Sequence, residues 1–392
     1  MTVRISKPPI DLRSKLSELE RPTGLKGNEL LRAETAQDAR EVLSAGRKNM
    51  IINGAMAIDQ RNEGSSFDLT DSQHTYVLDR FTVRETTSTS YRVQRNTLSS
   101  DLDPPGFRHA MKISTLGNDQ SVATGDYSRF QYFVEAQDLK CDWGIHNTDY
   151  LTLSFWVKSS ATGRYFVNLE DGDADPIYLK PYDISQADTW QKIEVTYPPP
   201  TSGDWTTSTA NDKGMRITWV LSCGTNYQTT AVDQWRSAYY MADSAQVNFA
   251  GATGNAFWIT GVQLERGRNA TEFEHRSYGE ELALCQRYYG KIKMSQQEWL
   301  YNESNTSSHK WHWTNIPFSM RANPSIDVSD LSTGISVSGL SGTISSISAQ
   351  TPGDTPGRVS TRITMTQNTG TARYVYHFDG WQNEYMALSA EL

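Results

Sequence analysis

The amino-acid sequence predicts a mainly β protein built around a jelly-roll β-sandwich, and three observations point to this fold class. Stretches such as LTLSFWVK, residues 151–158, alternate between two sets of residues, as a strand with one buried face does. Turn-forming stretches such as SSATG and PPPTSGD separate these segments. Aromatic residues make up 11% of the 392 residues, and aromatic side chains favour strands. Many short strands without intervening helices indicate a sandwich.

Changes in composition divide the chain into four predicted parts. Residues 1–47 form an N-terminal helical arm, residues 48–276 the jelly roll, residues 277–290 a short linking helix, and residues 291–392 a second, small C-terminal β-sandwich domain. The length suits two or three domains and is ample for a buried core. Within the last part, TRITMT and ARYVYHF are the clearest strands.

The N-terminal arm contains no Trp, Tyr or Phe and shows two short helical patterns. One is an apolar stripe that ends at Pro22, and the other begins at the candidate N-cap Thr35. Neither pattern can build a core of its own. The arm is therefore either a partly disordered leader or, as we favour, a segment that docks on a partner. The leucines assigned to that attachment are Leu12, Leu16, Leu19, Leu30 and Leu31.

The linking helix is the short helical pattern in FEHRSYGEELALCQRYY, residues 273–289, which lies between two β regions. Ser277 and Glu280 form an S-x-x-E capping box, and Gly290 stands where a C-terminal cap belongs. Four further residues follow the 4-3-4 spacing of a heptad seam. The helix either lies only on its own sandwich or also meets symmetry-related copies. In the second case the trimer interface consists of Tyr278, Leu282, Cys285 and Tyr289.

The sequence contains no motif of a known catalytic or cofactor site, such as G-x-S-x-G, a P-loop or H-E-x-x-H. We therefore expect no cofactor, no bound metal and no enzymatic activity. His309 and His312 would lie on opposite faces of a strand, which argues against a shared metal. The alternating carboxylates Asp171, Asp173 and Asp175 suit either Ca²⁺ or, as we favour, a solvated turn.

The bulk numbers exclude several classes of partner. The net charge is −8 and no basic run stands out, so we expect no nucleic-acid partner. The chain has no run of about 18 apolar residues and no signal peptide at its start, so we expect neither membrane insertion nor secretion. The 3 cysteines lack metal-site or disulfide spacing, which fits a protein made in a reducing cytoplasm.

Aromatic residues in loop-like stretches are the remaining functional signal. Trp143, Trp205, Trp235, Tyr239 and Tyr240 lie in such stretches, and rings of this kind stack on the apolar faces of sugars. The alternative is that they pack in cores or subunit interfaces, where aromatic residues are also enriched. In the C-terminal part the candidate glycan contacts are Trp299, Trp311 and Trp313.

Several motifs resemble those of a jelly-roll module that is common in bacteriophage virion proteins. The stretch KNMIINGAMAIDQRNEGSSF resembles the start of the module, with Asn53, Gln60 and Arg61 among the matching residues. YVLDRF resembles the next motif of the module, in which Phe81 stands in place of the usual Trp. WITGVQLERGRNATEFEHRSYGEELALCQRYY resembles its ending. The residues after it and the terminal AEL are similar to an appended C-terminal domain, and the leader is similar to fibre-type proteins of short-tailed marine and cyanobacterial phages.

This resemblance implies a structural tail fibre of the virion that is made in the host cytoplasm and is a homotrimer. Its N-terminal arm would bind a phage tail, neck or capsid protein, and its distal domain would contact a host cell-surface glycan. The jelly roll also resembles carbohydrate-binding modules. Alternatives are a fibre that decorates the capsid and, from another class, a tailspike that depolymerises polysaccharide, although no carboxylate pair stands out. The resemblance carries no catalytic or sugar-binding residues over to this chain.

Overall fold

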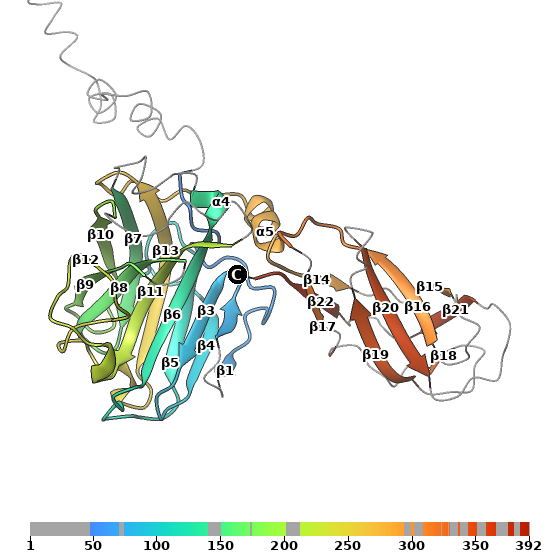
Figure 1. Ribbon diagram of the computed structural model, residues 1–392, viewed down its shortest axis with the longest axis horizontal. Coiled ribbons are helices and arrows are strands. Elements are labelled where there is room, and N and C mark those ends of the chain that lie inside the picture. Colours follow the sequence, from blue (N-terminus) through green and yellow to red (C-terminus); the bar gives the residue numbers. More distant parts are fainter. Residues whose placement is uncertain are drawn as a thin grey trace, which may run out of the picture. The chain divides into compact units, whose positions relative to one another are not determined.

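The structure is a computed structural model that describes residues 48–69, 74–139, 150–172, 175–200 and 212–293, and shorter pieces of residues 299–391 (Figure 1). Those pieces are residues 299–301, 309–322, 324–327, 329, 336–337, 344–350, 358–365, 375–379 and 385–391. The predicted arm, with Leu12, Leu16, Leu19, Leu30 and Leu31, lies outside the described residues, as do Trp143 and Trp205. Met50–Leu392 forms one compact unit and is described by itself.

The jelly roll consists of two antiparallel sheets that face each other, which confirms the predicted sandwich. Strands far apart in sequence are neighbours, as in a jelly roll. Sheet I contains, in spatial order, β1 (Phe67–Leu69), β4 (Tyr91–Thr97), β5 (His109–Thr115), β13 (Ala256–Arg266), β7 (Leu151–Ser159) and β10 (Gln191–Tyr197). Sheet II contains β12 (Trp235–Arg236), β9 (Ile177–Ile184), β8 (Gly163–Asp171), β11 (Lys213–Cys223), β6 (Tyr127–Glu135), β3 (Phe81–Glu85) and β2 (Thr75–Leu78).

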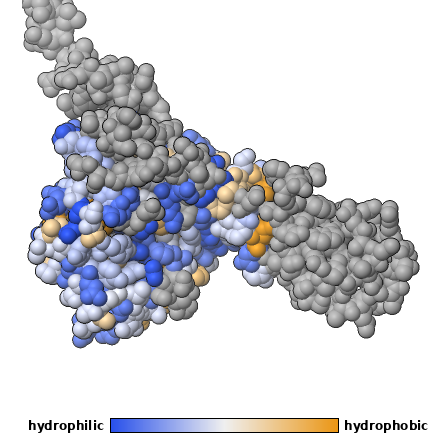
Figure 2. Space-filling view, viewed as in Figure 1, coloured by the Kyte–Doolittle hydropathy of each residue, from blue (hydrophilic) through white to orange (hydrophobic). Residues whose placement is uncertain are grey.

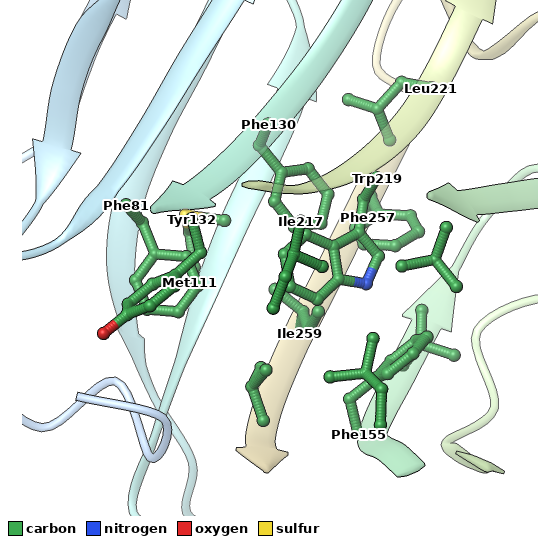
Figure 3. Close-up of a cluster of buried hydrophobic side chains, with 14 of the residues drawn as sticks. Phe81, Met111, Phe130, Tyr132, Phe155, Ile217, Trp219, Leu221, Phe257 and Ile259 are labelled. Carbon is green, nitrogen blue, oxygen red and sulfur yellow. The ribbon is translucent and has the colours of Figure 1, made fainter. Parts of the chain in front are cut away.

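The hydrophobic core fills the space between the two sheets, and the sequence pattern of β7 predicts its face correctly. Leu151, Leu153, Phe155 and Val157 are all fully buried in it. At its centre lies Trp219 of β11, with the Phe130 ring stacked at 4.9 Å and the Phe155 ring edge-on at 5.9 Å (Figure 3). The described surface of the jelly roll in Figure 2 is mostly hydrophilic, as expected when the apolar faces turn inward.

The linking helix, α5 (Tyr278–Gln286), is shorter than predicted. Ser277 is its N-cap and accepts a hydrogen bond from the Glu280 N–H, as the capping box predicts. The prediction of Gly290 as its C-terminal cap is wrong. Gly290 lies in the following strand, because its neighbour Tyr289 already pairs with Ser389. A Cβ at Gly290 would lie 2.2 Å from the Phe318 ring, so close packing explains this glycine.

Other described helices are short: α4 (Ala136–Leu139) and the 3-10 turns η1 (Thr225–Tyr227) and η2 (Phe249–Gly251). The C-terminal part is β-structure, as predicted, and its strands form two sheets. Sheet III contains β14 (Tyr289–Lys293), β22 (Tyr385–Ser389) and β17 (Ser325–Asp327). Sheet IV contains β18 (Ser336–Val337), β21 (Val375–Asp379), β15 (Trp299–Tyr301), β16 (His309–Asn315), β20 (Arg358–Met365) and β19 (Ile344–Gln350).

The end of the chain returns to the jelly roll through a buried ion-pair network. Glu391 accepts hydrogen bonds from Arg61 at 2.9 Å and from Arg80 at 2.7 Å, and all three side chains are largely buried. The Arg80 guanidinium also lies 3.5 Å from the centre of the Tyr288 ring. Nearby, Arg287 donates to Glu135 at 2.9 Å. We call Arg61, Arg80, Glu135, Arg287 and Glu391 the junction network.

The motif residues that carry the virion-protein resemblance support this junction. The buried Asn53 amide donates to the carbonyls of Ile58 and Asp79. The Asp79 carboxylate accepts from the Gln60 backbone N–H at 2.7 Å and from the Gln60 side chain at 2.6 Å. Gln60 in turn donates to the carbonyl of Tyr289, the last residue of the closing motif, residues 258–289. These residues hold segments together inside one chain, so their role is structural.

Candidate functional site

The outer face of sheet II, opposite the hydrophobic core, carries polar side chains in an ordered array. Along β6, Phe130, Tyr132 and Val134 point into the core, so the alternate residues Arg129 and Gln131 lie on the other side of the sheet. The same alternation continues on β3, β8 and β11. The residues of this array are Arg84, Arg129, Gln131, Asn168, Glu170, Arg216 and Thr218, and we call them the sheet II face.

The register of the strands arranges this face in rows. Arg84 of β3 is opposite Arg129 of β6. The next row joins Gln131 of β6, Thr218 of β11 and Asn168 of β8. In the third row, Arg216 of β11 lies between Phe133 and Glu170. Neighbouring strands place such side chains within about 5 Å of each other, so each row is a set of direct neighbours.

The middle row leaves two amide oxygens without partners. Gln131 donates its Nε2 to the Thr218 hydroxyl at 2.7 Å, and Asn168 donates its Nδ2 to the Met241 carbonyl at 2.8 Å. Both side chains are then fixed, and no described group donates to Gln131 Oε1 or Asn168 Oδ1. Gln131 is 1% and Asn168 0% exposed. An unsatisfied buried acceptor costs about 1–3 kcal/mol, so two such acceptors on the strands that flank β11 suggest a missing hydrogen-bond donor.

The two central arginines are held in place, but they differ in their contacts with acids. Arg129 donates to the Tyr239 hydroxyl and lies 4.7 Å from the Tyr127 ring centre, and within the described part of the chain no carboxylate forms an ion pair with it. Arg216 donates to the Gly172 carbonyl at 2.9 Å and lies 3.5 Å from Glu170. Gly172 is required there, because a Cβ would lie 1.9 Å from the carbonyl oxygen of the neighbouring strand.

Several cations of this face lie close to His74 and affect its pKa. That pKa falls to about 4, first because partial burial removes some water from the ring, which still reaches solvent, and then because cations lie near it. Those cations, in order of effect, are Arg129, Arg84, Arg216 and Lys213.

Glu170 is one of the carboxylates near these cations. Burial raises its pKa, and the charges of Arg216 and Arg129 oppose that rise. Glu135 of β6 is opposite Lys213 of β11, and Asp171 is close enough to raise the pKa of Glu170 as well.

Aromatic side chains border the face. Tyr227 stands edge-on to Tyr127 at 5.2 Å and to Tyr239 at 5.9 Å. Tyr239 remains partly exposed, as do Arg84 and Arg216, so the face reaches solvent along this border. Tyr239 is one of the loop aromatics that the sequence indicates. Trp235, another of them, instead packs on the Tyr178 ring and donates to the Pro198 carbonyl.

The sequence-predicted glycan contacts in the C-terminal part lie on strands of sheet IV. Trp299 is in β15, and Trp311 and Trp313 are in β16, together with His309 and His312. Their side chains are outside the described residues, so glycan contact there stays a prediction. Asp173 is also outside them, and the Ca²⁺ question at residues 171–175 stays open. Among the described residues no group of three metal-ligating side chains occurs.

The four residues predicted for the trimer interface have different surroundings. Cys285 is 1% and Tyr289 6% exposed, and both are buried by their own chain. Leu282 packs at the edge of the cluster that contains Cys285, whereas Tyr278 is 65% exposed. The surface of this helix that a second copy can reach therefore includes Tyr278 and excludes Cys285.

Comparisons with known proteins identify no relative by sequence: no family model and no curated protein matches the chain. Among solved structures, the bacteriophage CBA120 tailspike protein 4 enzymatically active domain is similar over 56% of this chain and 21% of its own length, with 11% identity and a TM-score of 0.29. TmCBM61 in complex with β-1,4-galactotriose covers 56% of this chain and 99% of its own, with 9% identity and a TM-score of 0.30.

The family 11 carbohydrate-binding module from Clostridium thermocellum, in complex with a β-1,3-1,4-mixed-linked tetrasaccharide, covers 52% of this chain and 98% of its own. It has 13% identity and a TM-score of 0.25. Similarity at this level carries no argument about ligand or reaction. None of the described helices has the length and apolarity of a membrane span.

Proposed function

We propose that this protein is a non-enzymatic glycan-binding protein whose sugar site is the sheet II face. The observation that carries the proposal is the row of Gln131, Thr218 and Asn168, in which two buried amide oxygens accept no hydrogen bond from the described residues. Gln131 and Asn168 are 1% and 0% exposed, so a saccharide reaches this row only when the segment of Tyr239 and Met241, to which Arg129 and Asn168 donate, moves aside. Sugar hydroxyls donate and accept at once, so they would then supply the missing donors. The partly exposed Tyr239 adds a ring at the border, as sugar sites commonly use.

The wider proposal is a virion fibre, which rests on the motif resemblance. The arm of residues 1–47 would bind a tail, neck or capsid protein, and the rest of the chain would contact host-surface glycans from the particle. A single site of this size binds a sugar weakly. Three copies in a homotrimer, and several fibres on a particle, would raise the overall strength of attachment by about a hundredfold to ten-thousandfold through effective concentration.

Glycan binding is tested with the full-length chain on an array of bacterial surface polysaccharides. We expect Gln131→Leu and Asn168→Leu to reduce binding at least tenfold, because each removes an acceptor for a sugar hydroxyl. Lys112→Gln, on the outer face of sheet I beside Trp258, is the matched control and should bind normally. Unchanged thermal unfolding of each variant shows that the fold is intact.

The same array decides between the two candidate sites. Loss of binding in Trp311→Ala and Trp313→Ala, with full binding in both Leu variants, would move the sugar site from sheet II to sheet IV. Release of reducing ends from any bound polysaccharide would replace the binding role with a depolymerase.

The homotrimer is tested by light scattering. We expect about three times the chain mass of 44.1 kDa, and a monomer at micromolar concentration would contradict the trimer. Tyr278→Asp is the informative variant at α5, because Tyr278 is exposed and its replacement leaves the interior intact. A charge at Cys285 would disrupt the interior instead and would test folding.

A further inference from the structure

We infer that the saccharide bound by the sheet II face is acidic, carrying a carboxylate, phosphate or sulfate group that meets Arg129 and Arg216. This inference rests on the proposed sugar site and specifies the chemical class of its ligand. It follows from three features of the face: the arrangement of its cations, the shortage of carboxylates near Arg129, and the polar row beside them.

The cations converge from three strands onto one side of sheet II. Arg84 and Arg129 are opposite each other on β3 and β6, and the Arg84 guanidinium is 3.3 Å from the His74 ring. On β11, Arg216 and Lys213 both lie over the Phe133 ring, at 5.5 Å and 4.5 Å from its centre. Like charges gathered in this way repel each other unless an anion joins them.

The cations of this face differ in the acids beside them: Glu135 is opposite Lys213 in the strand register, whereas no described carboxylate pairs with Arg129. Arg129 is 2% exposed, and the described residues offer it a tyrosine hydroxyl and two tyrosine rings in place of a carboxylate. Glu170 is 3.5 Å from Arg216, a long contact for an ion pair. A buried arginine normally has a charged partner, and a guanidinium binds carboxylate or phosphate with two parallel hydrogen bonds. An anionic group on the ligand would fill this role.

The adjoining polar row favours a sugar over a nucleic acid. Gln131, Thr218 and Asn168 offer amide and hydroxyl groups beside the arginines, at the spacing of neighbouring strands. Nucleic-acid sites spread positive charge over a wide surface, whereas this chain has a net charge of −8 and joins the cations of this face to a row of neutral polar side chains. An acidic saccharide needs both parts of the face, the cations for its charge and the row for its hydroxyls.

Bound negative charge would also change the protonation of His74. Partial burial, and after it the charges of Arg129, Arg84, Arg216 and Lys213, hold its pKa at about 4 in the free protein, so the ring is neutral at pH 7. An anion that offsets these charges raises that pKa, so binding takes up a proton and strengthens as the pH falls.

Protonation of Glu170 should also strengthen the binding of an anion as the pH falls. Its pKa is raised by burial, so it gains a proton and loses its repulsion for an anion as the pH falls. Affinity for an acidic glycan should therefore rise as the pH falls toward 4, the pKa of His74 in the free protein, for glycans whose acidic groups stay ionised there.

The test uses the full chain and acidic bacterial polysaccharides printed in pairs, each native and after carboxyl reduction, desulfation or dephosphorylation. We expect the native member of a pair to bind at least tenfold more tightly than the neutral member, and binding to weaken at 0.5 M NaCl. The kind of pair that responds identifies the anionic group. Equal binding within pairs, or binding of neutral glycans alone, would overturn this inference and leave glycan binding standing. No binding to any glycan would overturn both.

Variants connect the result to the face. Arg216→Gln should lose at least tenfold in affinity for the native polysaccharides, and Arg216→Lys, which keeps the charge, should lose less. Lys112→Gln is the control for removing a cation elsewhere on the sandwich. A single-stranded oligonucleotide is included on the array, and tighter binding to it than to every acidic glycan would contradict the saccharide. Equal affinities of wild type and Arg216→Gln would also contradict the inference.

Discussion

The junction network and the sheet II face both hold buried arginines, yet they differ in what surrounds these charges. In the junction, Arg61 and Arg80 share the Glu391 carboxylate, and Arg287 pairs with Glu135. On the sheet II face, Arg129 has aromatic rings and a hydroxyl in place of an acid. We propose that the arginines paired with the chain's own acids hold the fold together and that Arg129 is placed for a ligand. On this proposal the contrast separates structural from functional charge.

The largest expected effect is at Arg80. Arg80→Met leaves the buried Glu391 without its closest partner, and breaking a buried ion pair from one side costs about 3–5 kcal/mol. Urea denaturation would measure this loss. Arg92→Met is the control, since the exposed Arg92–Asp68 pair should contribute less than about 1 kcal/mol. Similar losses in the two variants would show that the junction is no stronger than a surface ion pair.

A second effect is pH-dependent and concerns Asp79, beside the junction network. Burial raises its pKa from 3.8 to about 6, against the hydrogen bonds from Gln60. The folded protein therefore holds this proton more tightly than the unfolded chain. Its stabilising effect is complete below pH 3.8 and is lost as the pH rises through 6, a change of about 3 kcal/mol at most.

The variant Asp79→Asn isolates this contribution, because it removes the titrating group. As the pH rises from 4 to 7, the free energy of unfolding of Asp79→Asn should increase relative to that of wild type. A difference that is constant across this range would mean that Asp79 titrates normally.

The smallest expected effect on stability is at Arg129. Arg129→Met removes a buried cation that has no acidic partner among the described residues. The variant loses the contacts of the guanidinium but no longer pays the cost of burying its charge, and the two effects nearly cancel. We expect the free energy of unfolding to change by less than about 1 kcal/mol while glycan binding is lost, as functional sites commonly trade stability for activity. A loss as large as that of Arg80→Met would make Arg129 structural and remove the contrast between the two regions.

The sequence predicts the local features of the molecule well. The alternation in β7 identifies the buried face that includes Leu153 and Phe155, and the capping box identifies the start of α5 at Ser277. The end of α5 was predicted wrongly, because Gly290 is drawn into a strand by β22, which lies almost 100 residues later. Local signals therefore give the start of the helix and the strands, while a distant partner decides where the helix ends.

The sheet II face was not predicted, and β6 shows why. All nine residues of YSRFQYFVE, Tyr127–Glu135, are buried, so exposure does not distinguish its polar from its apolar positions. In the sequence, Arg129 and Gln131 look like ordinary strand residues. The sequence signal that could have indicated this face is the alternation of Arg129 and Gln131 with aromatic residues along one strand. It becomes a site only when β3, β8 and β11 bring Arg84, Asn168 and Arg216 beside it.

What the sequence by itself determined is the periodicity of each strand, and with it the fold class and the core, because side-chain alternation is a property of neighbouring residues. Only the tertiary structure decided which polar residues became neighbours across strands, and which arginines received an acid. Glu391 reaches Arg80 from 311 residues away, whereas no described acid pairs with Arg129. Such pairings depend on strand register between distant segments, and electrostatic balance follows from distances that no local pattern encodes.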